Sequence, residues 1–250
     1  MSRSTATVST DRIGAAAGVS FVVLMVVGVG TYPNLQPPYA EDAVRAAYVD
    51  RAGTTAVSAV LQLLGIIPFL VFLASLWRRL RGTDEAFATI TLIGGIATSI
   101  VILIWQAVII GALTAANEVE GVDARPILAI VTAMDQSVTL PLSIMAGAAG
   151  IAILRGRSLP SWLGWLGIVT AVLGIVGVLA IAAVFTTGFG RALAAANPLA
   201  LLLFLVWTIG VFDRVHPLTA RGCMNRSCSE AREQVVDQRP ELARRSGRSR

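Results

Sequence analysis

Repeated apolar runs restrict the fold of this chain more than any other feature. About 20 apolar residues form a helix long enough to cross the hydrocarbon core of a bilayer. Such a segment must be helical, because lipid offers no partner for free backbone N–H and C=O groups. The sequence therefore predicts an all-α, polytopic transmembrane bundle of six helices, with spans over residues 13–32, 55–77, 86–115, 127–154, 162–185 and 198–212.

Composition agrees with a membrane protein. The 250 residues are 55% hydrophobic and only 14% charged, whereas soluble domains carry about 25% charged residues. Polar segments flank the transmembrane domain of residues 13–213, namely an N-terminal segment of residues 1–12 and a basic tail of residues 214–250. The tail has too few large apolar residues to form a core, so we expect it to be disordered.

The 20 basic residues, all of them arginine, are distributed unevenly between the two sides of the bundle. Sixteen fall on the side of the N-terminus and the tail, and four fall on the opposite side. Because positively charged connections stay in the cytoplasm, both termini are predicted to be cytoplasmic. The first external connection is the longest, and its segment Glu41–Arg51 has an amphipathic pattern that suits either the membrane surface or a plain surface helix.

Sequence motifs of enzymes and metal sites are missing. The chain has no H-E-x-x-H, no G-x-S-x-G and no P-loop. Its single His and its two Cys, Cys223 and Cys228 in the tail, are too few for a zinc site. We therefore expect no catalytic activity, no metal and no cofactor. The net charge of +5 follows the membrane topology rather than a nucleic-acid site, so the expected partners are the lipid bilayer and a membrane protein or a second copy of the chain.

Strongly polar side chains occur at a similar depth in three of the predicted helices. Asp135 and Gln136 interrupt the fourth apolar run, and Gln62 and Gln106 interrupt the second and third. Thr139 follows Gln136 at the spacing that places both on one face of a helix. The sequence therefore predicts an intramembrane polar site in the outer half of the bilayer, on a face of the fourth helix that points into the bundle.

Two interpretations of this site are open from the sequence. In the first, the polar side chains hold the helices together through interhelical hydrogen bonds, each contributing about 0.6 kcal/mol. In the second, Asp135 is a functional acid, because a carboxylate within the membrane needs a partner, a water cavity or a proton. The first interpretation predicts a structural or accessory membrane protein, and the second predicts a small proton-linked permease or exporter of a lipophilic or cationic molecule.

Small residues indicate where the helices approach closely. Gly147 and Gly150 continue the polar face of the fourth helix, and Gly167 and Gly174 lie along a narrow strip of the fifth. Because small side chains let helix backbones come together in a membrane, we expect these glycines to form packing seams.

The segment from Leu154 to Gly174 carries a distinctive motif. An Arg-containing turn runs into L-P-x-W-L-x-x-L-G over Leu159–Gly167. This motif, the closing sequence NPLALLLFLVWTIGVF and the long first external connection resemble a bacterial family of six-helix integral membrane proteins of unknown function. Basic residues that are all arginine would suit an actinobacterial-type member. The resemblance implies a multi-pass protein of the bacterial cytoplasmic (inner) membrane. It does not indicate an activity, because the family has no established one.

Overall fold

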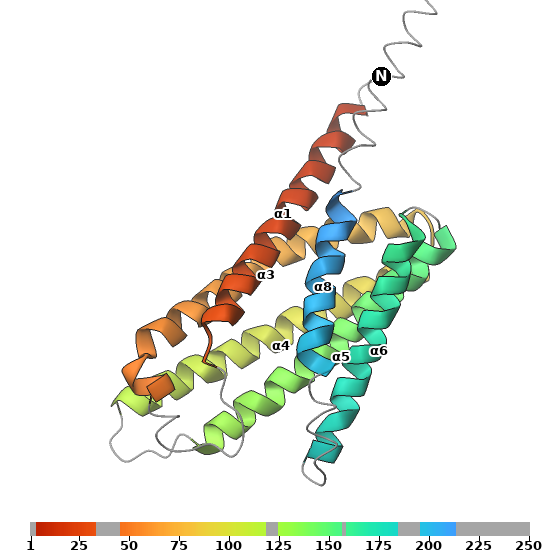
Figure 1. The fold of residues 1–250 in the computed structure, drawn as a ribbon. Coiled ribbons are helices and arrows are strands. Elements are labelled where there is room, and N and C mark those ends of the chain that lie inside the picture. Colours follow the sequence, from red (N-terminus) through yellow and green to blue (C-terminus); the bar gives the residue numbers. More distant parts are fainter. Residues whose placement is uncertain (1–3, 34–45, 119–124, 157–158, 185–195, 214–250) are drawn as a thin grey trace, which may run out of the picture.

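The computed structural model describes residues 4–33, 46–118, 125–156, 159–184 and 196–213 (Figure 1). These ranges contain helices and no strands. A short π-helical segment, η1 (Ala46–Asp50), precedes α3. The other helices are α1 (Ser4–Thr31), α3 (Ala52–Arg81), α4 (Glu85–Glu118), α5 (Arg125–Gly156), α6 (Ser161–Val184) and α8 (Ala196–Asp213).

Five helices, α1 and α3 to α6, are long and apolar enough to cross a membrane. Large apolar side chains such as Ile67, Ile93 and Leu179 are exposed on their outer surfaces. An apolar surface of this extent is typical of a protein that contacts lipid hydrocarbon. The chain is therefore a multi-pass integral membrane protein. The sixth predicted span corresponds to α8, whose apolar part, Ala196–Val211, is shorter than the other five.

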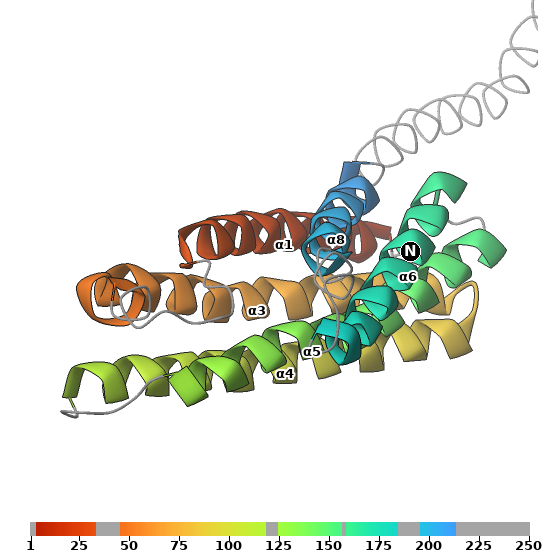
Figure 2. The ribbon, with the colours of Figure 1, turned by 60° about the horizontal axis from the view of Figure 1, so that its bottom comes forward.

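Successive helices run antiparallel and pack side by side. Each of α1, α3, α4 and α5 contacts the next long helix, and α8 then lies between α6 and α1 (Figure 1). Figure 2 shows the same bundle with α1 over α3 and with α4 and α5 beneath them. The register of α1 on α3 is set by close approaches of Gly14 to Ser75 and of Gly28 to Gln62.

Two apolar clusters fill the interior. The larger one is centred on aromatic rings of α1, α3 and α8, with the ring centroids of Phe21 and Phe69 4.9 Å apart and those of Phe204 and Trp207 5.8 Å apart. The indole Nε1 of Trp207 donates a hydrogen bond of 3.0 Å to the carbonyl oxygen of Leu163, which ties α8 to α6. The smaller cluster surrounds Trp105 and includes Ala47 and Tyr48 of η1.

Arginines mark one end of the bundle, which we call the arginine end. Arg78, Arg79 and Arg81 lie in the last turn of α3, and Arg155 lies in the last turn of α5. The opposite end, where α3 and α5 begin and α4 ends, is called the far end.

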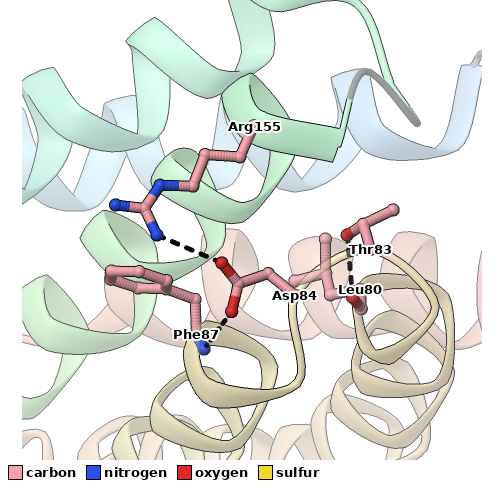
Figure 3. A network of polar contacts seen from close by, with 5 residues as sticks. All are labelled: Leu80, Thr83, Asp84, Phe87 and Arg155. Atoms are coloured by element: carbon pink, nitrogen blue, oxygen red, sulfur yellow. Dashed lines mark hydrogen bonds and ion pairs between the residues drawn. The ribbon is translucent and has the colours of Figure 1, made fainter.

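At the arginine end, one carboxylate joins the turn between α3 and α4 to α5 (Figure 3). Asp84 Oδ1 accepts a hydrogen bond of 3.3 Å from the backbone N–H of Phe87, and Asp84 Oδ2 lies 3.2 Å from Arg155 Nη1. The Arg155 guanidinium also stacks 4.7 Å from the centroid of the Phe87 ring. Within the same turn, the Thr83 hydroxyl donates to the Leu80 carbonyl oxygen at 2.8 Å. Asp84 therefore caps α4 and fixes α5 beside it.

The segment η1 packs against the far end of the bundle. Ala47 and Tyr48 are 3% and 0% exposed. The Thr55 hydroxyl donates to the Ala47 carbonyl at 2.9 Å, and the Asn117 amide donates to the Tyr48 carbonyl at 2.8 Å. These contacts hold η1 on α3 and α4, so Ala47 and Tyr48 face the bundle, and a position of this segment at the membrane surface stays a prediction.

The helices extend beyond several of the predicted spans. The first helix begins at Ser4 rather than near residue 13, because neither Gly nor Pro interrupts the chain before Gly14. The described part of the predicted N-terminal segment thus continues the first helix. The predicted tail, residues 214–250, lies outside the residues that the structure describes.

Candidate functional site

The polar residues predicted for the site lie near the far boundary of the membrane. A hydrocarbon core about 30 Å thick takes about 20 residues of a straight helix, or about 23 residues of one tilted by about 30°. Counted from Arg155, this length of α5 ends close to Asp135. The same count from Arg78 on α3 and from Phe87 on α4 ends near Ser58 and Gln106, which therefore lie within about one turn of the level of Asp135.

Aromatic residues lie at the same level, as expected for a membrane boundary. The Tyr32 and Trp105 rings are 6.2 Å apart, and the Tyr32 and Tyr48 hydroxyls are 2.9 Å apart. Exposed apolar side chains continue about one turn further, at Ile110 and Ile130. Asp135 therefore lies within about two turns of the far boundary, a depth at which water defects reach a charged side chain.

A chain of hydrogen bonds links α4, α3 and α1 at this level. The Gln106 Nε2 donates to Gln62 Oε1 at 2.9 Å, and Gln62 Nε2 donates to the Ser58 hydroxyl at 3.2 Å. The Ser58 hydroxyl donates to the Gly28 carbonyl at 2.6 Å. Both glutamines and Ser58 are 0% exposed. The structure thus brings Gln62 and Gln106 together as a buried interhelical pair.

One atom of this chain is left without a hydrogen-bond donor. Gln106 Oε1 is buried and has no partner among the described residues. An unpaired buried acceptor costs about 1–3 kcal/mol, so a native structure that retains one calls for a bound water, ion or ligand at that position. The adjacent indole Nε1 of Trp105 is also buried and unpartnered.

A second amide pair joins α5 to α8. Asn197 Nδ2 donates to Gln136 Oε1, and the Thr139 hydroxyl donates to the backbone carbonyl of Gln136 at 2.5 Å. Gly177 of α6 makes room for the Asn197 side chain, because a Cβ on Gly177 would collide with its amide. Asn197 was not among the predicted site residues. Its position before Pro198 indicates a helix cap, and nothing in the sequence identifies Gln136 as its partner.

Asp135 belongs to neither amide pair. Its side chain is exposed, and no hydrogen bond or ion pair joins it to another residue that the structure describes. It nevertheless lies on the inward side of α5, because Val131, four residues before it, and Leu142, seven residues after it, share its side of the helix. These two neighbours are only 4% and 5% exposed.

The length of α8 explains this exposure. Its N-terminal residue Asn197 pairs with Gln136, so the described part of α8 covers α5 from that level towards the arginine end only. The predicted single site is therefore divided: Gln62 pairs with Gln106, Gln136 pairs with Asn197 beside a buried Thr139, and Asp135 faces the far end without a covering helix among those described.

The predicted packing glycines lie where α5 and α6 approach most closely. A Cβ at Gly150 would be 2.6 Å from the Gly164 carbonyl oxygen, and a Cβ at Gly167 would be 2.7 Å from the Ala146 carbonyl oxygen. Gly147 faces Ala171 across the same interface, and Gly174 faces Ser143. No larger residue fits at Gly150 or Gly167 unless the two backbones separate.

In chemical terms, the far end offers hydrogen-bond acceptors. Among the described residues near this level, the unpartnered acceptors are the Asp135 carboxylate, Gln106 Oε1 and Asn197 Oδ1, which suit a cation or an N–H or O–H donor. The Trp105 Nε1 is an unpartnered donor. Among the described residues, no group of three His, Cys, Asp or Glu side chains is placed to hold a metal ion. Comparison with protein families, curated proteins and solved structures found no match to this chain.

Proposed function

We propose that this integral membrane protein binds a small organic cation at Asp135 and carries it across the bilayer as a small permease or exporter. The observation that supports the proposal is the state of the Asp135 side chain, which is exposed on the inward side of α5 and has no partner among the described residues. A carboxylate at this depth is costly unless water, a cation or a proton reaches it.

The depth of Asp135 favours entry of the ligand from the far end. The excess of arginine at the other end favours a cytoplasmic location for that end, so the far end would face the outside of a bacterial inner membrane. Proton coupling follows from the same carboxylate, because a proton and an organic cation would compete for it. Binding of one would then release the other.

Uptake into proteoliposomes tests this function. The probe is benzylguanidinium, whose guanidinium group stays charged at neutral pH and therefore leaks slowly through lipid. We expect a pH gradient to drive uptake by the wild-type protein and expect Asp135→Asn to abolish it. The matched control is Glu118→Gln, which removes an acid at the exposed far end of α4 and should transport normally. Equal uptake by the wild-type protein and Asp135→Asn would contradict the proposal.

A structural or accessory role is the second candidate. The observation that favours it is the use of polar and small residues to join helices, as in the Gln62–Gln106 pair and the contacts of Gly150 and Gly167. This role predicts that a stoichiometric membrane partner copurifies equally well with the wild-type protein and Asp135→Asn, and that neither protein transports the probe.

A further inference from the structure

The hydrogen-bond chain at the far end has a fixed direction. It ends on the Gly28 backbone carbonyl, which can only accept, so the Ser58 hydroxyl must donate to it. The Ser58 oxygen is then the acceptor for the Gln62 amide nitrogen, and the Gln62 oxygen is turned towards α4. Gln106 must therefore present its nitrogen to Gln62, which leaves its oxygen Oε1 as the open end of the chain.

The open oxygen is held in place by the rest of the chain. Rotating the Gln106 amide by half a turn would place two oxygens against each other, and correcting this would require Gln62 to rotate as well. The single Ser58 O–H could then donate to Gln62 or to Gly28, so one hydrogen bond of the chain would be lost. The site thus has a preorganised acceptor. A ligand that supplies one N–H donor would satisfy an oxygen that is buried and unpartnered in the described part of the protein.

Asp135 lies about one turn from this oxygen along the bundle axis. The register of α4 on α5 is set where Gly94 approaches the backbone of Pro141 and Met145, with a Cβ at Gly94 only 2.8 Å from the Met145 nitrogen. Counting outward along the two antiparallel helices from this contact places Gln106 level with Val131. Asp135 is four residues from Val131, which is about 6 Å along the helix.

We propose that the ligand is a cation that carries N–H donors, a guanidinium or a protonated amine, and that it lies between α4 and α5 with its charge at Asp135 and an N–H on Gln106 Oε1. This inference rests on the proposed function, because it identifies the class of cation that the same site takes. A quaternary ammonium has the same charge and no N–H group, so it meets Asp135 and leaves the Gln106 oxygen unpaired.

A pair of probes with one ring and one permanent charge tests the requirement for N–H donors. Binding of benzylguanidinium and of benzyltrimethylammonium is measured by titration calorimetry on protein in lipid nanodiscs, with empty nanodiscs subtracted. We expect wild-type protein to prefer benzylguanidinium by at least about tenfold, because tenfold corresponds to about 1.4 kcal/mol and a hydrogen bond that involves a charged group contributes at least that much. Asp135→Asn should bind neither probe.

Two glutamine variants separate recognition from stability. Gln106→Met and Gln62→Met remove the same interhelical hydrogen bond, but only Gln106→Met removes the free oxygen. We expect Gln106→Met to abolish the preference for benzylguanidinium. Gln62→Met keeps the Gln106 oxygen but frees its amide to rotate, so we expect this variant to weaken the preference without abolishing it. Should Gln106→Met fail to fold, equal affinity of the wild-type protein for the two probes would still overturn the inference.

The outcomes distinguish this inference from the function on which it rests. Equal wild-type affinity for the two probes, lost in Asp135→Asn, would overturn the requirement for N–H donors and leave a cation site at Asp135. A preference that survives in Gln106→Met would also overturn it, because the N–H donors would then be recognised by another group, such as the Asp135 carboxylate. Binding of neither probe above the empty nanodiscs would contradict the proposed function itself.

Discussion

The contact between α5 and α6 predicts a large effect from the smallest change at Gly150. A Cβ there would lie 2.6 Å from the Gly164 carbonyl oxygen and 3.1 Å from the Ile168 backbone nitrogen. Ordinary contact begins at 3.4 Å, so Gly150→Ala must separate the two backbones by about 0.8 Å, the difference between 3.4 and 2.6 Å. A gap of this size forfeits a quarter to a half of the dispersion energy of the contacts that it opens.

The matched control is Gly111→Ala on α4, where a new Cβ has nothing within 4 Å. Both variants gain the same helix propensity, about 1 kcal/mol for Gly to Ala. The difference between them therefore isolates the cost of overpacking, which is about 1–3 kcal/mol. We expect Gly150→Ala to unfold several degrees below Gly111→Ala, at about 2–4 °C per kcal/mol for a chain of this size.

Thermal unfolding in detergent, followed by the circular dichroism of the helices, measures this difference. Gly111→Ala should match or exceed the wild-type melting temperature. The reasoning would be refuted if Gly150→Ala were as stable as Gly111→Ala, because two backbones in contact cannot accept a methyl group without moving apart.

Three further predictions concern stability. Asp84→Ala should lower the free energy of unfolding by about 1 kcal/mol through loss of the α4 cap. Arg155→Gln should lower it by less, because an ion pair with an exposed partner contributes little. A larger effect of Arg155→Gln than of Asp84→Ala in chemical unfolding would contradict this expectation. A double-mutant cycle of Gln62→Met and Gln106→Met should give a coupling of about 0.6 kcal/mol, as for other interhelical hydrogen bonds in bilayers, and a coupling of zero would show that the pair is not formed. Asp135→Asn should leave the free energy of unfolding within about 0.5 kcal/mol of wild type, and marked destabilisation would make Asp135 a structural residue.

Much of the fold follows from apolar runs and small residues, which are local properties of the sequence. Five long apolar helices lie where the first five spans are predicted. The contacts of Gly150 and Gly167 follow from the position of small residues on facing helix sides. The approach of Gln62 to Gln106 follows from their similar depth, since antiparallel neighbours joined by a short turn meet at equal distance from that turn.

The remaining features depend on distances that no local pattern contains. The pairing of Gln136 with Asn197 requires that α8 begin level with Gln136 and that Gly177 leave space for it. The exposure of Asp135 also depends on where α8 begins, because an α8 that extended further towards the far end would cover this side chain. The burial of Tyr48 likewise depends on how far α3 and α4 extend at the far end of the bundle.

The central claim is that Asp135 faces a water-accessible space at the far end of the bundle rather than lipid. It is tested by replacing the two cysteines, Cys223 and Cys228, with serine and introducing single cysteines on α5. A membrane-impermeant maleimide reacts with thiols in water. Thr139→Cys serves as the buried control, since Thr139 is 5% exposed. Leu140→Cys serves as the lipid-facing control, since Leu140 is exposed on the opposite side of α5.

We predict rapid labelling of Asp135→Cys in intact membranes by reagent added at the far end, with little labelling of either control. Protection of Asp135→Cys in the membrane, together with labelling equal to that of Leu140→Cys once detergent is added, would place this side chain in lipid and contradict the account.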